Sequence, residues 1–229
     1  MTTNDTTNAG GETRRRLIEA GVRLFGLHGF EATATRTLAA AAGANLGAIR
    51  YHFGGKEGLY RAVLEHIVRI KLDDVRPELE RLSALCADPA AGRDRLLGGL
   101  RAMVRTMVAV MLDDPASQPF SQIMMQEQIA PTPAYDILYE GFFRKIHAAW
   151  AMLLARLTGL APDSPELQLR TLTVMGQFVI FRVGMPAILR RLGLEKLDRE
   201  HLDCIAAIGV QQIEAIITGF APIRPEAQA

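Results

Sequence analysis

The chain has 229 residues, of which 49% are hydrophobic and 22% are charged, enough to bury the core of a small domain together with a larger one. Its net charge of +1 excludes a strongly basic or acidic protein, and its two cysteines, Cys86 and Cys204, form no disulfide framework. No apolar run approaches the ~20 residues of a membrane span, and the polar start lacks a secretory signal, so we expect a cytoplasmic protein outside the membrane.

Positive charge is concentrated near the amino terminus. Between Glu12 and Lys56 there are seven Lys and Arg residues and three Glu residues, a net charge of +4, whereas the rest of the chain carries −3. A basic end on a slightly acidic body is typical of a protein that meets a polyanion at that end.

Helical spacing of apolar residues dominates the sequence and strand patterns are nearly absent, so we expect an all-α fold. Residues 1–11 are polar, and we predict a disordered tail there. The predicted helices cover residues 12–28, 35–42, 46–52, 57–84, 90–112, 116–129, 133–157, 165–190 and 199–218. Capping residues mark five of the later helix starts: Asp88, Asp114, Thr132, Ser164 and Asp198. Gly29 should end the first helix, and Pro77 and Pro186 should kink or break the helices that contain them.

The two short helices at 35–42 and 46–52 are joined by a tight turn. Thr35 and Asn45 can cap their starts, and Gly43 between them suits a left-handed stop. Three residues at positions i, i+3 and i+7 of the second short helix should face a small core: Leu46, Ile49 and Phe53.

The opposite side of this second short helix carries Tyr51, with Gly47 and Ala48 beside it, Arg50 toward one edge and His52 toward the other. A solvated face would normally carry Lys, Glu or Gln, whereas nearly bare backbone allows close approach to another surface. The major groove of DNA is such a surface, and the Ala48 methyl group could contact a thymine methyl group there.

The segment 13–67 resembles the amino-terminal DNA-binding domain of TetR-family transcriptional regulators. The matching features are Leu-Ala-x-x-Ala-Gly at 38–43, Tyr-His-Phe at 51–53, and a Lys-Glu pair at 56–57 before Leu59. The resemblance implies a three-helix helix-turn-helix domain whose third helix enters the major groove.

The resemblance also implies a domain organisation and a set of DNA contacts. A DNA-binding domain would cover 12–56, and a larger helical domain for effector binding and dimerisation would cover 57–220. Arg36 would reach a guanine edge, Thr35 would bind a phosphate at a helix start, and the side chains at 51, 52 and 56 would fix the register on the backbone. The whole predicted DNA-binding set is Thr35, Arg36, Asn45, Gly47, Ala48, Arg50, Tyr51, His52 and Lys56.

Other interpretations of these residues stay open at this stage. Tyr51 and His52 could pack against the fourth helix instead of contacting DNA. Arg14 to Arg16 form either a solvated first turn or an arm that reaches the minor groove. Many TetR-family members carry Tyr where this chain has Arg50, so the partner of Arg50 is phosphate, base or protein.

The chain from about Leu72 onward is rich in Met and aromatic residues that suit an adaptable apolar pocket, although core packing explains most of them. Polar residues within apolar surroundings would complete such a pocket. The predicted effector pocket is Met103, Met107, Phe120, Met124, Glu127, Tyr135, His147, Trp150, Gln177, Phe178 and Arg182. Glu127 is the most suggestive member, but a structural pair with an Arg explains it equally well.

Two segments, QEQIAPTPAY and MGQFVIFRVGMPAILRRLG, resemble the carboxy-terminal domain of the CecR-type branch of the family. This resemblance implies a regulator of export or detoxification genes and leaves the effector open. Family resemblance also implies that the helices near 165–190 and 199–218 pair with those of a second copy as a four-helix bundle. Apolar residues on more than one side of the last helix agree with this.

We therefore expect a homodimeric, ligand-responsive repressor of a palindromic operator in double-stranded DNA. The sequence has no catalytic motif and no cofactor loop, and the cluster His201, Asp203 and Cys204 lacks a second pair of metal ligands. Two alternatives are a helical enzyme or ligand-binding protein with a vestigial head, and a DNA-binding adaptor without a small-molecule effector.

Overall fold

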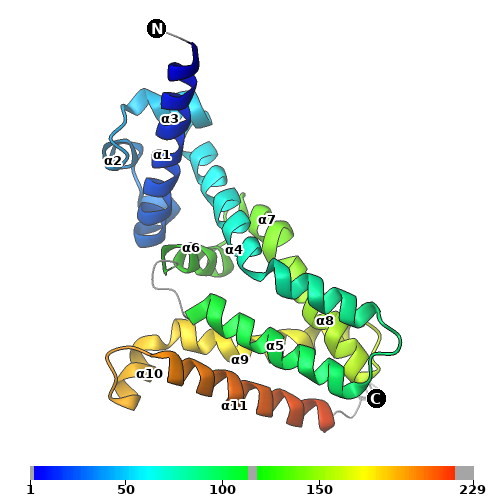
Figure 1. Cartoon of the computed structure of the whole chain (residues 1–229). Helices are drawn as coiled ribbons and strands as arrows, with labels where there is room; N and C mark the ends of the chain where they lie inside the picture. The colour runs from blue at the N-terminus through cyan, green and yellow to red at the C-terminus, as the bar shows by residue number, and fades with distance from the viewer. Residues whose placement is uncertain (1–2, 113–117, 220–229) are drawn as a thin grey trace, which may run out of the picture. The chain divides into compact units, whose positions relative to one another are not determined.

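The computed structural model describes residues 3–112 and 118–219, with side chains of the first helix described from Gly10 onward. Every regular element in these ranges is helical, which confirms the predicted all-α fold (Figure 1). Contacts divide the chain into two compact units. Unit 1 is Met1–Asp73 with Pro115–Phe143, and unit 2 is Asp74–Asp114 with Arg144–Ala229.

Unit 1 contains α1 Thr3–Ala32, α2 Thr35–Ala41, α3 Leu46–Phe53, the first part of α4 (Lys56–Ala87), α6 Gln118–Ile129, α7 Tyr135–Leu138 and the π-helical turn η2 Tyr139–Phe143. The apolar faces of these elements share one core. Its largest fully buried side chains include Leu17, Phe25, Leu38, Ile49, Leu59, Leu64, Ile67, Ile123 and Leu138.

Glycines let α1 lie close against its neighbours in unit 1. A Cβ atom built on Gly21 would lie 2.7 Å from Val63 Cγ2 of α4, and one built on Gly26 would lie 2.9 Å from the Pro119 carbonyl oxygen of α6. Gln126 of α6 donates a hydrogen bond of 2.9 Å to the Gly26 carbonyl oxygen. These contacts join α4 and α6 to α1, so unit 1 extends beyond the domain of residues 12–56 that the sequence predicts.

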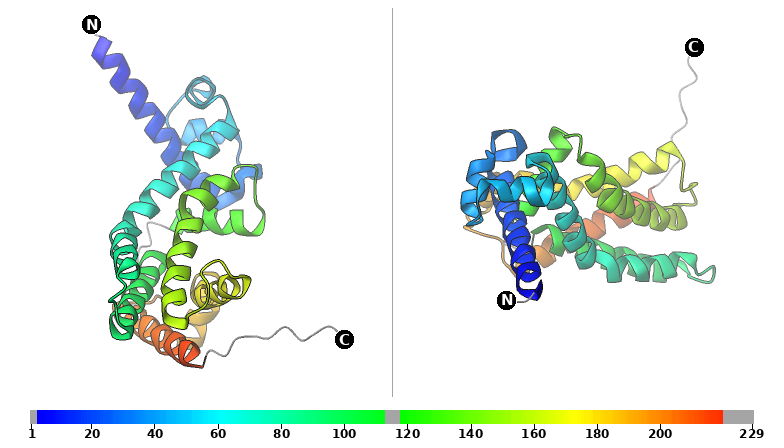
Figure 2. Two further views of the ribbon diagram at one scale, coloured as in Figure 1. Left: turned by 90° about the vertical axis from the view of Figure 1, so that its right-hand side faces the viewer. Right: turned by 90° about the horizontal axis from the view of Figure 1, so that it is seen from above.

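Unit 2 contains the rest of α4, α5 Arg93–Leu112, α8 Arg144–Thr158, α9 Pro165–Val183, α10 Met185–Leu192 and α11 Arg199–Thr218. α9 and α11 run alongside each other (Figure 2), and a Cβ atom on Gly209 of α11 would lie 2.5 Å from the Phe178 ring of α9. Arg156 of α8 fixes the loop between α4 and α5 by donating hydrogen bonds to three carbonyl oxygens, those of Cys86, Asp88 and Ala91.

Several predicted helix ends are confirmed. The side chains of Asn45, Ser164 and Asp198 cap α3, α9 and α11 by accepting hydrogen bonds from backbone amides. Gly29 has a non-helical backbone, with φ 80° and ψ 169°, that kinks α1 near its end. The break predicted near Pro186 occurs between α9 and α10, whose axes are bent by 71°. No single helix of the described ranges is long and apolar enough to cross a membrane. Taken together, the bent pair α9 and α10 has the length and composition of a crossing segment.

Two features of the long helices differ from the sequence prediction. α1 begins at Thr3, where a disordered tail was expected, because extending an anchored helix needs no new nucleation. Of the two effects predicted for Pro77, a kink or a break, the break does not occur, because α4 continues to Ala87. The proline removes the amide partner of the Asp73 carbonyl, but both residues are exposed and water can replace the lost hydrogen bond.

Other predicted helix starts are shifted. Ala34, and not Thr35, is the N-cap of α2, and it makes no side-chain hydrogen bond. Asp88 and Thr132 accept hydrogen bonds from nearby amides in turns that precede the next helices. The single helix predicted at 133–157 is divided into α7, η2 and α8. The start predicted at Asp114 lies outside the described residues.

Candidate nucleic-acid interface

The turn between α2 and α3 is fixed by backbone hydrogen bonds. Gly43 has a left-handed backbone with φ +58°, as predicted, and its amide donates to the Ala40 carbonyl oxygen over 3.0 Å. The Ala44 amide donates to the Ala39 carbonyl oxygen over 2.9 Å, and the Asn45 side chain accepts from the Ala48 amide over 2.9 Å. These bonds hold the start of α3 in a defined position after α2.

A second tight connection joins α3 to α4. Gly54 and Gly55 have φ values of +77° and +153°, conformations that disfavour residues with a side chain. Within α4, a Cβ atom built on Gly58 would lie 1.8 Å from the Phe53 carbonyl oxygen. The first turn of α4 therefore presses against the last residue of α3. The sequence pattern did not reveal the role of Gly58, because a close tertiary approach leaves no periodic signal.

The exposed face of α3 carries Tyr51, which is 83% exposed, as the helical spacing predicts. Gly47 and Arg50 are also exposed. The sequence wrongly placed Leu46 in the core: it is 53% exposed. The outward side of α3 is therefore made by four residues, Leu46, Gly47, Arg50 and Tyr51.

The inward side of α3 also differs from the prediction, because Ala48 takes the place in the core that was predicted for Leu46. Ile49 is 2% exposed, and Phe53 and Ala48 are partly buried against the core of unit 1. Ala48 was expected beside Tyr51 on the outward face. Because α3 begins at Leu46, that residue has no preceding helical turn beside it, and the core is filled by Ile49, Phe53 and Ala48 instead.

Residues of α1 brace the end of α3. The Arg14 guanidinium of α1 lies over the Phe53 ring of α3, at 5.3 Å from its centroid. Within α3, the His52 ring lies edge-on to the Tyr51 ring, with 4.9 Å between their centroids. Arg15 forms exposed ion pairs with two neighbours on α1, Glu12 and Glu19. For Arg15, the interpretation as a solvated turn fits these contacts better than that of a minor-groove arm.

Lys56 links the end of α1 to the start of α4. Its Nζ donates to the Glu31 carbonyl oxygen over 3.1 Å and lies 4.5 Å from the centroid of the Phe30 ring. The buried Thr33 hydroxyl strengthens the same corner by donating to the Gly29 carbonyl oxygen over 2.7 Å. An ammonium group has three donors, so these contacts leave capacity for the phosphate contact that the sequence predicts for Lys56.

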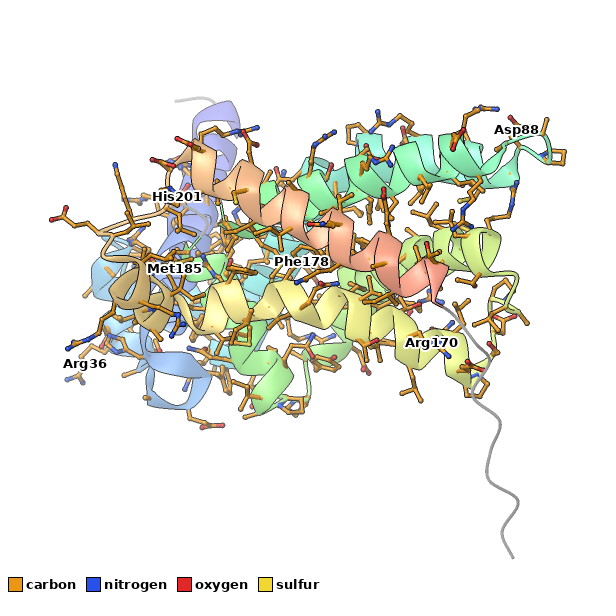
Figure 3. All side chains as sticks on the ribbon, turned by 90° about the horizontal axis from the view of Figure 1, so that it is seen from below. Arg36, Asp88, Arg170, Phe178, Met185 and His201 are labelled. Carbon is orange, nitrogen blue, oxygen red and sulfur yellow. The ribbon has the colours of Figure 1, made fainter. Side chains whose placement is uncertain are left out.

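Arg36 lies in the first turn of α2 and is exposed, and Figure 3 shows its side chain extending outward from the ribbon. Thr35 before it is partly buried, at a helix end that has no side-chain cap. No acidic residue occurs between Glu31 and Glu57. Arg36, Arg50 and Lys56 therefore lie on a segment without negative side chains, which favours contact with phosphates.

The predicted effector-pocket residues fall into both compact units. Unit 1 contains Phe120, Met124, Glu127 and Tyr135, and unit 2 contains Met103, Met107, His147, Trp150, Gln177, Phe178 and Arg182. Two open grooves on unit 2 are lined by other residues, one between α4 and α5 and one between α5 and α11.

Glu127 is 1% exposed and is held inside unit 1. The Tyr60 hydroxyl donates to its carboxylate over 2.6 Å, the Thr132 hydroxyl over 2.9 Å and the Thr132 amide over 3.1 Å. Burial and the Glu127 carboxylate raise the pKa of Tyr60 well above its ordinary value. The partners of Glu127 are thus a tyrosine and a threonine, where the structural alternative predicted an Arg.

Two polar candidates of unit 2, His147 and Arg182, are half-buried. Burial lowers the pKa of His147 and that of Arg182, and Arg182 Nη1 donates to the Met111 carbonyl oxygen over 3.4 Å. Trp150 is fully buried, and its Nε1 has no hydrogen-bond partner among the described residues. These groups are compatible with a polar ligand, and their role as a pocket stays a prediction.

Two neighbouring helices of unit 2 expose apolar side chains. On α9 these are Leu169, Leu172, Val179, Ile180 and Val183, and on α11 they are Ile208 and Ile216. Helical spacing places four of these side chains on one stripe of α9, at positions 169, 172, 180 and 183, with Gly176 between them. A stripe of this kind on adjacent helices is typical of a surface that is covered in an assembly.

Comparison with known proteins assigns both parts of the chain. Residues 17–63 match the family of bacterial regulatory proteins described as the tetR family, and residues 97–220 match the C-terminal domain of the HTH-type transcriptional dual regulator CecR. Over 212 residues the chain is 31% identical to the HTH-type transcriptional dual regulator CecR of Shigella flexneri, covering 93% of this chain and 94% of that protein. Over 51 residues it is 41% identical to the HTH-type transcriptional repressor AcnR of Corynebacterium glutamicum, covering 22% of this chain and 27% of the repressor.

Solved structures show the same fold at low sequence identity. A transcriptional regulator from Rhodococcus sp. Rha1 has a TM-score of 0.57 and 21% identity, with 88% of this chain and 96% of the other covered. A transcriptional regulator of the TerR/AcrR family from Aquifex aeolicus VF5 has a TM-score of 0.53 and 14% identity, with 89% and 99% covered.

Proposed function

This chain belongs to the TetR family of bacterial transcriptional regulators, with a carboxy-terminal domain of the CecR type, and from that premise we propose that it is a homodimeric, ligand-responsive repressor of a palindromic operator. A DNA-binding regulator needs a surface that fits a groove. The single observation that carries the proposal is the outward face of α3, where Tyr51 is 83% exposed beside bare backbone at Gly47.

The proposed DNA contacts follow from this face. α3 enters the major groove, Arg36 reaches a guanine edge from the first turn of α2, and Thr35, His52 and Lys56 contact phosphates. Asn45 acts through its cap of α3, and Arg50 lies on the exposed side of the same helix. A protein that binds chromosomal DNA would act in the cytoplasm.

The exposed apolar stripe of α9, together with the exposed isoleucines of α11, supports homodimerisation through these two helices. Two copies would bury the stripes against each other as a four-helix bundle. A dimer also presents two reading heads, as a palindromic operator with half-sites about 34–36 Å apart, or a multiple of this, requires.

The direction of regulation has a second candidate. The relative from Shigella flexneri, which is similar over nearly the whole chain, is described as a dual regulator. A protein of this type could activate some promoters and repress others. A reporter gene behind each protected promoter distinguishes the two, because deletion of the regulator raises expression from a repressed promoter and lowers it from an activated one.

We propose that an effector binds within the helical carboxy-terminal domain and shifts the equilibrium between two head separations. Such a coupling typically changes operator affinity by about 5–150-fold. An enzyme with a vestigial head would bind no operator, and an adaptor without effector would keep the same affinity in the presence of any small molecule. The family and relatives of this chain are transcriptional regulators, which favours the proposal over the enzyme.

The test is a mobility-shift titration of the full-length protein on the DNA upstream of its own gene, followed by mapping of the protected bases. We expect one protected inverted repeat and a steep dependence on salt. A dimer that neutralises about six phosphates should lose about a thousandfold in affinity between 50 and 200 mM salt. Binding that shows no preferred site in this DNA and in a randomised duplex library would rule out the proposal.

A further inference from the structure

Leu46 occupies an unusual position for an aliphatic side chain. It is the first residue of α3 and is 53% exposed, and it is not among the described residues that pack against the core of unit 1. Its neighbours Ala44 and Ala48 both pack against that core. A single exposed leucine is ordinary on a protein surface, so the meaning of Leu46 depends on what surrounds it.

The surroundings of Leu46 are the outward face of α3. Leu46, Gly47, Arg50 and Tyr51 are all exposed, and at positions i, i+1, i+4 and i+5 they lie on one side of the helix. Gly47 leaves space beside Leu46, because it has no side chain. Among the described residues, a Cβ atom built there would meet only the Asn45 side-chain oxygen, at 3.3 Å.

The position of Leu46 at the helix start also matters. Cα–Cβ bonds in a helix tilt toward its amino terminus, so the Leu46 side chain extends past the beginning of α3. In helix-turn-helix proteins the amino-terminal residues of the recognition helix are those that contact base edges. Within the major groove the apolar group on a base edge is the C5 methyl group of thymine.

We propose that Leu46 is a specificity-determining residue that contacts a thymine methyl group in each operator half-site; this inference rests on the proposed function of α3. Leucine has no hydrogen-bonding group, so it gains nothing from a phosphate or from the polar edge of another base. The sequence assigned a thymine contact to Ala48, but Ala48 is partly buried against the core, and Leu46 is the exposed aliphatic side chain of the same helix.

The test uses the full-length protein and a duplex library with a randomised centre. Selection with the unchanged protein gives its preferred half-site, and each thymine of that half-site is then replaced by deoxyuridine, which lacks only the methyl group. We expect one position at which deoxyuridine weakens binding by about fourfold in one half-site and about fifteenfold in both. For Leu46→Ala the same replacement should change affinity by less than twofold, and selection should lose the thymine preference at that position.

The matched control is Leu27→Ala, which removes the same atoms from a leucine that is 67% exposed on α1 of the same unit. Its selected site and its sensitivity to deoxyuridine should equal those of the unchanged protein. Leu46→Gln, which keeps the length of the side chain and adds hydrogen-bonding groups, should shift the preferred base at that one position. Thermal unfolding of each variant shows that the head is folded.

Three results would overturn the assignment. The first is equal sensitivity of Leu46→Ala and the unchanged protein to deoxyuridine, and the second is an unchanged selected site for both Leu46 variants. The third is a folded Leu46→Ala that binds all sequences more weakly by one common factor, because this would make Leu46 a positioning residue. If the unchanged protein selects no site, the proposed function fails as well, so the two failures are distinguishable.

Discussion

Buried polar side chains in unit 1 hold backbone and side-chain partners in place. Glu127 accepts hydrogen bonds from Tyr60 and Thr132, and the buried Thr33 hydroxyl donates to carbonyl oxygens near the kink of α1. A buried carboxylate is costly unless such bonds compensate for its lost hydration. The sequence correctly marks Glu127 as a buried charge, but it does not reveal its partners, because Tyr60 is 67 residues away along the chain.

The hydrogen bond between Tyr60 and Glu127 should be measurable as stability. We expect Tyr60→Phe to lower the free energy of unfolding by ~1–3 kcal/mol, because the buried carboxylate loses a donor at 2.6 Å and no water reaches it easily. Urea unfolding followed by circular dichroism measures the change. The control Tyr51→Phe removes an exposed hydroxyl and should change stability by less than ~0.5 kcal/mol. Equal effects of the two variants would show that the hydrogen bond contributes nothing.

Arg36 should determine which base is preferred, whereas Lys at the same position should supply only charge. We expect Arg36→Lys to keep most of the general affinity for DNA and to lose ~1–3 kcal/mol of discrimination at one guanine per half-site. Selection of binding sites at constant salt measures this base preference. The control is Arg23→Lys, at an exposed arginine of α1. A selected site that still contains this guanine after Arg36→Ala would remove Arg36 from the base contacts.

At the scale of elements, the features that depend on residues close in sequence were predicted better than those that depend on tertiary packing. The cap at Asn45, the left-handed Gly43 and the break before Pro186 depend on neighbours in sequence, and all three occur in the structure. The core assignment of Leu46 and the outward assignment of Ala48 were wrong, because the residues of α3 that reach the core depend on its packing against α1 and α2, which helical spacing alone does not contain. The inclusion of α6 in unit 1 depends on contacts about 100 residues apart, which no single-sequence pattern contains.

Gly58 gives a test of the close approach between α3 and α4. Because a Cβ atom there would lie 1.8 Å from the Phe53 carbonyl oxygen, Gly58→Ala should displace the start of α4 and destabilise unit 1 by at least ~2 kcal/mol. The matched control is Gly98→Ala in α5, where a Cβ atom meets nothing within 4 Å. This control should stabilise the protein by ~0.5–1 kcal/mol, since alanine favours a helix. Unfolding by urea separates the two, and a Gly58→Ala protein as stable as the unchanged one would contradict the close contact.

At the scale of the whole molecule, the proposed function requires assembly, because a palindromic operator is read by two heads. The exposed residues of α9 and α11 would otherwise leave large apolar side chains in water on two adjacent helices. Covering them with the same surface of a second copy gives a closed, twofold contact, and closure stops further growth. The same contact would let an effector change the separation of two heads, which a monomer cannot do.

Ile180 is suited to test this assembly because it is 57% exposed on the apolar stripe of α9. Ile180→Glu should leave the fold intact and convert the dimer to a monomer at micromolar concentration, since each copy would have to bury an unpaired carboxylate in the contact. Light scattering after size-exclusion chromatography measures the mass, and the mobility shift on a palindromic site should weaken by at least about a hundredfold because the second head is no longer tethered. Leu27→Glu, at an exposed leucine of α1, should leave the mass unchanged. A dimer that persists in Ile180→Glu and in the double variant Ile180→Glu with Ile216→Glu would place the contact between copies on another surface.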